Sequence, residues 1–132
     1  MTALPEAAAA IFSSPVFANL AVVDDTGLPH VTPIWVDVNP AGELIVNTAV
    51  GRVKDRLLGE GAKLAISASP ADNPYAWALV RGHVAERRLE TGDADIDALA
   101  EKYMGVDSYP FRKDGEVRVT IVIAPDRVVL SG

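Results

Sequence analysis

The amino-acid sequence predicts a mainly β fold in which antiparallel strands form a closed or partly closed barrel with short helices inserted. Six or more runs of β-branched and apolar residues follow one another within 132 residues, and turns of hairpin length join most of them. A doubly wound α/β fold fits less well, because its parallel strands would alternate with helices of crossover length. The length and the 49% apolar content suit a single domain over residues 1–132.

The first part of the chain predicts one helix and three strands. Pro5 and Glu6 open a run of four alanines, which favours a short helix over 4–13 that ends near Ser13 and Ser14. The turn formers "DDTG" and "NPAG" then divide three apolar runs. These runs predict antiparallel strands over residues 16–24, 28–38 and 43–48.

The middle of the chain predicts a short helix followed by two strands. Within "GRVKDRLLGEG", the apolar Val53, Leu57 and Leu58 share one helix face and glycines end the helix. The segment "KLAISAS" predicts a fourth strand. The segment "YAWALVRGHVAERRLE" predicts a long fifth strand in which Gly82 marks a bulge or a close approach of the backbone.

The last part of the chain predicts a helix and a final strand. Thr91 is a candidate helix cap, acidic residues fill the following turn, and Gly105 stands just beyond the helical pattern. The segment "GEVRVTIVIAPDRVVLSG" predicts the last strand, with Pro125 marking a break before "RVVL".

The charge balance argues against a polyanionic partner. The chain has 12 basic and 18 acidic side chains, a net charge of −6, so nucleic acid or an anionic membrane would meet a repulsive field. The N-terminus has no basic segment before its apolar stretch, and no stretch approaches the ~20 apolar residues that span a bilayer. The absence of cysteine excludes thiolate chemistry and permits a cytoplasmic location. We therefore expect a soluble, cytoplasmic protein.

The sequence lacks the common catalytic and metal-binding motifs. No nucleophile elbow, Walker loop, dinucleotide fingerprint or His-Glu-x-x-His motif is present. His30 and His83 lie in different predicted strands, and we assign both to structural or surface roles. Asp24 and Asp25 suit a hairpin turn, and the alternating acids that follow Thr91 suit a helix N-terminus better than a calcium loop. If the protein is an enzyme, we expect no metal, and a bound cofactor must carry the reaction.

The segment "GRVKDRLL" concentrates positive charge in this acidic chain. Arg52, Lys54 and Arg56 follow a predicted strand end and open a predicted helix, whose first backbone N–H groups are free donors. A phosphate at this place would meet those donors and two of the basic side chains. Alternatively the basic residues form a solvated helix face, which Asp55 between them supports. Basic charge in a first helical turn is unfavourable without an anion, which favours the phosphate.

Two motifs give the sequence a family resemblance. The pattern G-x-P-x-x-x-P-x-W spans residues 27–35, and N-T-A-x-x-R-x-K-x-x-x-L spans residues 47–58. With "KLAISAS" and "YAWALVRGHVAE" they resemble the split-barrel flavin-binding superfamily of pyridoxamine-phosphate-oxidase-like proteins. More narrowly, the chain resembles the small actinobacterial enzymes that use the deazaflavin coenzyme F420. The resemblance covers about residues 5 to 130.

The resemblance implies a fold, an assembly and a set of binding residues. It implies a six-stranded antiparallel split β-barrel and a homodimer with two cofactor sites at the subunit interface. Arg52 and Lys54 match the phosphate-binding basic pair. The other cofactor-binding candidates are the ring-contacting stretch Thr32, Pro33, Ile34 and Trp35, the strand end and loop Asn47, Thr48, Ala49, Gly51 and Val53, and Tyr75 and Trp77 from the same or the partner subunit.

Several of these positions have a second interpretation. Trp35 could equally belong to the core. Tyr75, Trp77 and Leu79 alternate along the long predicted strand and could form an apolar stripe at a dimer interface. Arg81 could contact an anion or an acidic side chain.

The resemblance implies an oxidoreductase that transfers a hydride from reduced F420 to a small conjugated acceptor. Spare basic residues such as Arg56 could meet the acidic oligoglutamate tail of F420, which favours F420 over FMN. An FMN-dependent oxidoreductase on the same fold and a non-catalytic F420- or flavin-binding protein are the alternatives. The chain lacks the C-terminal basic motif of the true pyridoxamine-phosphate oxidases, so vitamin B6 oxidation is not expected. No side chain is assigned a catalytic role.

Overall fold

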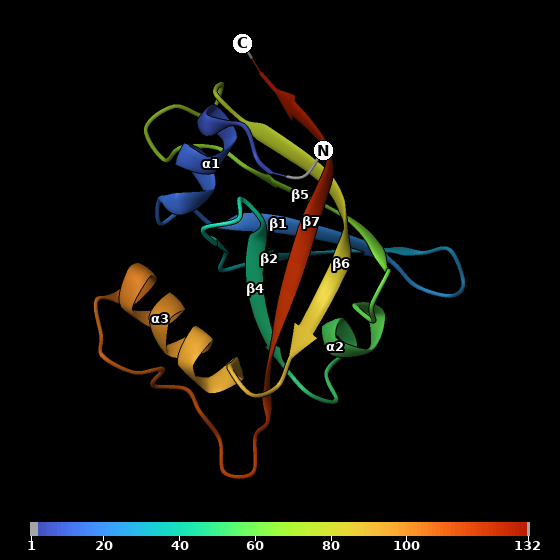
Figure 1. Ribbon diagram of the computed structural model, residues 1–132, viewed down its shortest axis with the longest axis vertical. Coiled ribbons are helices and arrows are strands. Elements are labelled where there is room, and N and C mark those ends of the chain that lie inside the picture. Colours follow the sequence, from blue (N-terminus) through green and yellow to red (C-terminus); the bar gives the residue numbers. More distant parts are fainter. Residues whose placement is uncertain (1–2, 132) are drawn as a thin grey trace.

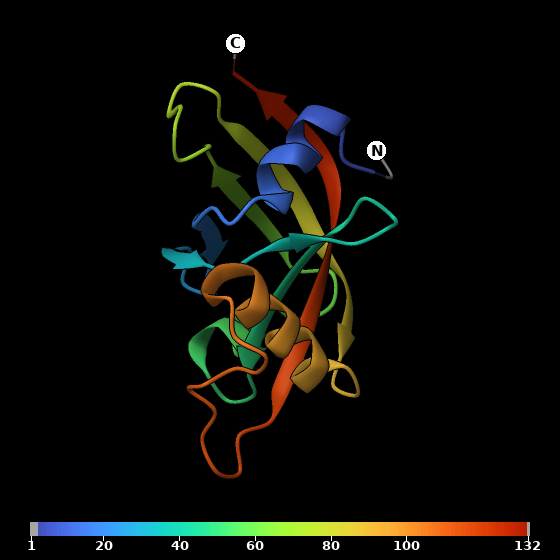
Figure 2. The same cartoon turned by 90° about the vertical axis from the view of Figure 1, so that its left-hand side faces the viewer.

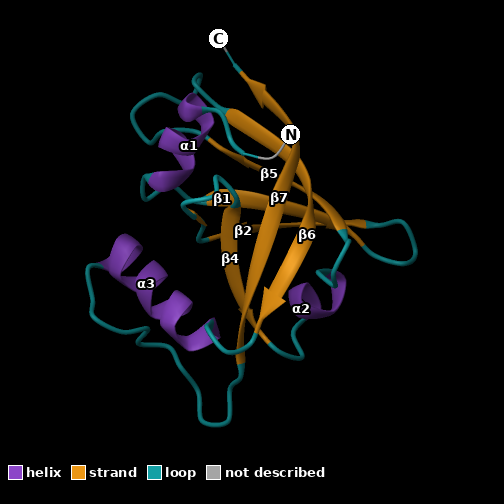
Figure 3. Ribbon diagram, viewed as in Figure 1, coloured by secondary structure: helices purple, strands orange, loops and turns teal. Residues whose placement is uncertain are grey.

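A single antiparallel sheet organises the chain in a computed structural model that describes residues 3–131 (Figures 1 and 3). Along the sheet the strand order is β2-β1-β5-β6-β7-β4-β3, so the sheet curls without closing and β2 and β3 form its two edges. The elements are α1 (Glu6–Ser13), β1 (Ala18–Val23), β2 (Pro29–Ile34), β3 (Asp37–Val38), β4 (Leu44–Ala49), α2 (Val53–Leu57), β5 (Lys63–Ala68), β6 (Ala78–Arg88), α3 (Gly92–Met104) and β7 (Arg118–Leu130).

The core lies inside the curl of the sheet. Side chains alternate between buried and exposed along β1 and β5, as expected for strands with one solvated face. Helices α1 and α3 lie on the same side of the sheet (Figure 2), and α1 inserts the fully buried Phe12. Each large side chain buried in this way contributes about 1.5–3 kcal/mol. The largest fully buried side chains include Phe12, Leu20, Leu44, Ile66, Ile121 and Ile123.

The predicted antiparallel strands and short helices are confirmed, with one strand divided. The run 28–38 forms β2, which pairs with β1, and the two-residue β3, which pairs with β4 at the opposite edge. The chain crosses between them at Trp35 and Val36, where the Val36 N–H donates to the Tyr103 hydroxyl instead of to a neighbouring strand. Side-chain pattern alone did not reveal this change of partner.

The predicted break at Pro125 is wrong, because β7 continues through it to Leu130. Pro125 lies opposite Gly82, and the pairing register shifts between Arg81 and Gly82. A bulge therefore accommodates the proline. Gly82 confirms the predicted close approach: a Cβ there would lie 2.3 Å from the Ala124 carbonyl oxygen.

The long strand β6 begins later than predicted, at Ala78, so Tyr75 and Trp77 lie in the loop before it. Hydrogen bonds to the side chain and backbone of Ser131 hold this loop: the Trp77 N–H donates to Ser131 Oγ (2.7 Å), and the Ser131 N–H donates to the Trp77 carbonyl (3.0 Å).

The ends of α3 match the prediction in position. Gly105 follows the helix with φ 70°, the left-handed conformation that glycine tolerates best. Thr91 occupies the N-cap position, but its hydroxyl makes no capping hydrogen bond. None of the helices within residues 3–131 has the length and apolar character needed to cross a bilayer.

Candidate functional site

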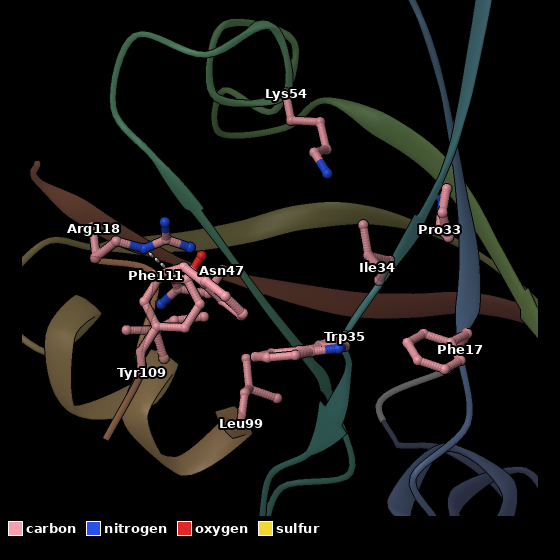
Figure 4. A pocket seen from close by; sticks show the side chains of 11 residues that line it. Phe17, Pro33, Ile34, Trp35, Asn47, Lys54, Leu99, Tyr109, Phe111 and Arg118 are labelled. Atoms are coloured by element: carbon pink, nitrogen blue, oxygen red, sulfur yellow. Dashed lines mark hydrogen bonds between the residues drawn. The ribbon is translucent and has the colours of Figure 1, made fainter. Parts of the chain in front are cut away.

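The candidate site is a cavity of about 270 Å³ between the end of β2, helices α2 and α3, and the loop before β7. Figure 4 shows its lining side chains. The cavity joins three of the predicted ring-contacting residues to one of the predicted phosphate-binding residues. It is lined by Phe17, Pro33, Ile34, Trp35, Asn47, Lys54, Ile96, Leu99, Tyr109, Phe111 and Arg118.

One wall of the cavity is flat and apolar. Pro33 and Ile34 come from β2, an edge strand, where a residue without an N–H group leaves no ladder bond unmade. Trp35 stacks on Tyr103, with ring centres 5.2 Å apart and planes 6° apart, and meets Tyr109 edge to face. Trp35 therefore packs against two tyrosine rings and also lines the cavity.

Lys54 supplies positive charge to the cavity. It extends from α2 toward the space bordered by Ile34 and Asn47 (Figure 4). Burial lowers the pKa of Lys54, and the neighbouring Arg52 and Arg118 lower it further. Within residues 3–131 no carboxylate forms a salt bridge with its ammonium group. A half-buried cation without an acidic partner is a candidate anion-binding group.

Arg118, at the start of β7, supplies a second cation and is almost completely buried. Its Nε donates to Asn47 Oδ1 (2.9 Å) and its Nη1 to Glu116 Oε1 (3.0 Å). Glu116 also pairs with Arg52 at 3.3 Å. Arg118 and Arg52 thus share one carboxylate while Lys54 has none, so the three basic side chains carry an excess of positive charge.

A second cavity of about 310 Å³ adjoins the first along β2. Lys54 lines both cavities, and both lie beside β2, a strand of six residues about 20 Å long; the two cavities together are called the groove below. This groove brings together the predicted residues Thr32, Arg52 and Val53 at one end and the apolar wall at the other. The second cavity is lined by Val22, His30, Thr32, Arg52, Val53, Lys54 and Leu57.

The predicted free backbone donors at the start of α2 are wrong for Gly51 and Arg52. The Gly51 N–H donates to Asp55 Oδ2 (2.8 Å), and the Arg52 N–H donates to the Ala49 carbonyl (3.2 Å). Asp55 is held in place by Arg87, which explains why an acid lies inside the basic segment. The backbone N–H groups of Gly51 and Arg52 are therefore already occupied by protein acceptors.

Other predicted residues lie away from the groove or support it indirectly. Thr48 and Ala49 are buried, and the Thr48 hydroxyl has no hydrogen-bond partner among the described residues. Arg56 is exposed and lines a shallow surface pocket with Asp24 and His30. Tyr75 is 83% exposed, while Trp77 and Phe17 line a separate cavity of about 330 Å³.

The sequence did not identify several lining residues. Ile96, Leu99, Tyr109 and Phe111 come from α3 and the following loop, whose position depends on tertiary packing. The sequence does contain one indication of Arg118, because this residue is a charged side chain directly before the apolar run "VTIVI". Charged side chains are rarely buried unless paired, so such a residue is a candidate for a specific role.

Each of the two histidines has an acidic partner, and His30 also lines the second cavity. His30 Nε2 lies 3.3 Å from Asp24 Oδ2, and His83 Nδ1 lies 2.8 Å from Asp126 Oδ2. Hydrogen bonds from the Thr26 side chain and other turn groups lower the pKa of Asp24 to about 2. Residues 3–131 contain no cluster of three or more side chains suited to a metal ion.

Comparison with known proteins identifies the fold. No family model and no curated protein matches the chain. An F420 reductase of known structure shares 29% sequence identity, with a TM-score of 0.81 over 96% of this chain and 98% of that one. A conserved hypothetical protein from Mycobacterium tuberculosis shares 21% identity, with a TM-score of 0.72 over 98% and 86% of the two chains.

A third structure gives the fold its name. A provisionally assigned pyridoxamine 5′-phosphate oxidase from Lactobacillus delbrueckii shares 18% identity, with a TM-score of 0.66 over 98% of this chain and 95% of that one. The chain has the split-barrel fold of pyridoxamine-phosphate-oxidase-like proteins, and the fold predicted from its sequence is confirmed.

Proposed function

We propose that the chain is an F420-dependent oxidoreductase that transfers a hydride from the reduced cofactor to a small conjugated acceptor. The observation that carries the proposal is the unpaired Lys54, which lies beside Arg52 in one cavity of the groove and beside the apolar wall of Pro33, Ile34 and Trp35 in the other. The 29% identity to an F420 reductase over nearly the whole chain supports the same cofactor class.

The residues of the groove fit a flavin-like cofactor. Lys54 and Arg52 would hold the phosphate, since charge-assisted hydrogen bonds to a phosphate offset the burial of a cation. Pro33, Ile34 and Trp35 would contact one face of the ring and exclude water from it. When bound, the reduced deazaflavin supplies the hydride, so the protein itself needs no strong acid, base or nucleophile.

We also propose that the chain acts as a homodimer with the groove completed at the subunit interface. The sheet face opposite α1 and α3 carries rows of small or apolar cross-strand neighbours, among them Val31, Ala21 and Ala65. Val31 is 62% exposed on this face. Arg81 lies directly opposite Arg127, and like charges at that distance are unfavourable unless acidic groups approach them. A second acidic copy of the chain would supply such groups.

Titration of the purified protein with F420 and with FMN, followed by fluorescence, tests the cofactor assignment. We expect saturable binding of F420 that is tighter than binding of FMN. Tighter binding of FMN would assign the groove to a flavin instead, and binding of neither would overturn the proposed function. Re-oxidation of reduced F420 in the presence of menadione, a conjugated quinone, tests turnover. If a broader panel of acceptors also gave no turnover, the result would favour a binding protein without catalysis.

A further inference from the structure

Arg118 presents unused hydrogen-bond donors to the cavity. A guanidinium group has five N–H bonds, and the bonds to Asn47 and Glu116 use one on Nε and one on Nη1. Among residues 3–131, Nη2 has no hydrogen-bond partner, and it is not fully enclosed by protein atoms. Because Arg118 lines the cavity, these donors are available to a molecule bound there.

The surrounding network fixes the orientation of the guanidinium. Asn47 Nδ2 donates to the Gly92 carbonyl (2.9 Å) and to Thr120 Oγ1 (3.3 Å), so its Oδ1 is held toward Arg118. Thr120 in turn donates to Asp95 Oδ2 (2.6 Å). The ring of Tyr109 covers the guanidinium, whose central carbon lies 5.1 Å from the ring centre. A planar donor held from three directions is preorganised for one ligand geometry.

The charge at Arg118 differs from the charge at Lys54. The almost completely buried Glu116 contacts Arg118 at 3.0 Å and also pairs with Arg52, so it offsets part of the charge of Arg118. Lys54 has no such acid. A guanidinium that has a carboxylate partner and free N–H bonds suits a neutral polar oxygen, whereas an ammonium without a carboxylate partner suits an anion.

We propose that Arg118 is a ligand-binding residue that donates from Nη2 to a carbonyl oxygen of the flat conjugated ring held in the cavity. The proposal rests on the proposed function and adds to it that different residues bind the two parts of the cofactor. Lys54 and Arg52 bind the phosphate, and Arg118 binds the ring. A ring with a carbonyl oxygen at its edge is then selected over a ring of the same shape without one, since the latter would leave a buried donor unpaired.

Two probes separate the two contacts: F420, and the phosphate-free deazaflavin that carries only the ring and its ribityl chain. Arg118→Lys keeps the positive charge beside Glu116 but shortens the reach and removes the planar donor. We expect it to weaken binding of both probes by about tenfold or more. The matched control Lys54→Met should weaken binding of F420 alone and leave the affinity for the phosphate-free probe unchanged.

A spectroscopic readout separates a contact with the ring from a loss of structure. A hydrogen bond to a ring carbonyl shifts the absorption band of the bound chromophore. We expect the shift to disappear in Arg118→Lys and to persist in Lys54→Met. If Arg118→Lys does not fold, the double variant Arg118→Gln with Glu116→Gln removes both charges together and leaves no unpaired carboxylate.

The possible outcomes distinguish this proposal from the proposed function. If the unaltered protein binds neither F420 nor FMN, both proposals fail. If it binds F420 and Arg118→Lys, or the double variant, binds the phosphate-free probe with unchanged affinity and an unchanged absorption band, the assignment of Arg118 alone is wrong.

Discussion

Lys54 and Lys102 are both half-buried lysines whose pKa is lowered mainly by burial, yet their surroundings are opposite. The ammonium of Lys102 donates to the carbonyl oxygens of Phe12 and Val36 and lies 3.5 Å from Asp37 Oδ1. It joins α3 to α1 and to the crossing between β2 and β3. Lys54 has no acidic partner, and two arginines lower its pKa further.

The comparison predicts which buried charges of this chain serve the fold and which bind a ligand. A buried cation with its donors satisfied stabilises the fold, and a buried cation without partners costs stability unless a ligand is bound. Burial alone does not distinguish the two. Substituting both lysines with methionine, which keeps most of the apolar stem, gives a matched pair of experiments.

The largest expected effect on stability is at Lys102. Lys102→Met leaves two buried carbonyl oxygens without their charged donor, and we expect the free energy of unfolding to fall by about 3 kcal/mol. Urea denaturation followed by circular dichroism measures the change. The affinity of the folded variant for F420 should be unaltered. A fall in the free energy of unfolding of less than about 0.5 kcal/mol, the scale of an ordinary surface substitution, would contradict the structural role of Lys102.

Lys54→Met should have the reverse effect. We expect the affinity for F420 to fall by about 1.5–3 kcal/mol, the scale of a charge-assisted hydrogen bond, while the free energy of unfolding stays the same or rises. The rise would come from removing a cation that Arg52 and Arg118 repel. Fluorescence titration and urea denaturation of the same preparation measure the two quantities. Unchanged affinity would favour the alternative in which Lys54 belongs to a solvated helix face.

Tyr103 provides a smaller test of the structural side of the comparison. Its hydroxyl donates to the Val16 carbonyl and accepts the Val36 N–H (3.1 Å), next to the bonds of Lys102. We expect Tyr103→Phe to lower the free energy of unfolding by about 1.5 kcal/mol, since the ring and its stacking on Trp35 are kept. Thermal melts measure the loss of stability. Comparing the melts of Tyr103→Phe, Lys102→Met and the double variant would show whether the two side chains stabilise the same contact of α3 with the backbone at Val36.

The smallest effect is a pH dependence of binding. The pKa of Lys54 in the free protein lies below its usual 10.5, and a bound phosphate would raise it again by stabilising the charged form. The affinity for F420 should therefore fall as the pH rises through the lowered pKa of the free protein. Titrations from about pH 7 to pH 10 should show this fall in the unaltered protein and a shallower one in Lys54→Met. Parallel curves would contradict the assignment.

The fold could be predicted because its signals are local. Alternating apolar residues, turn formers and the glycines at positions 82 and 105 define most elements within a few residues. The predicted boundaries are wrong where a contact with a residue distant in the sequence determines the local structure. The strand predicted over 28–38 divides because Tyr103 takes the Val36 N–H, and the loop before β6 is held by Ser131 near the end of the chain.

The candidate site was predictable only in part for the same reason. The motifs locate Pro33, Ile34, Trp35 and Lys54, which line one cavity. In the sequence, Asp55 supports a solvated basic helix face, but in the structure it accepts the Gly51 N–H and pairs with Arg87. Lys102 resembles an ordinary helix residue in sequence, and only its three partners reveal what it does.

Gly92 has a consequence for how this protein can vary. A Cβ at this position would lie 2.1 Å from the Arg118 carbonyl oxygen, so the start of α3 can approach β7 only because a methyl group is missing. Its own carbonyl receives the amide of Asn47. In a saturation-mutagenesis library, position 92 should therefore tolerate glycine alone. This restriction would come from packing, because glycine has no side chain that could bind a ligand. Designed or natural variants that alter this turn should lose the geometry of the cavity before they lose the sheet.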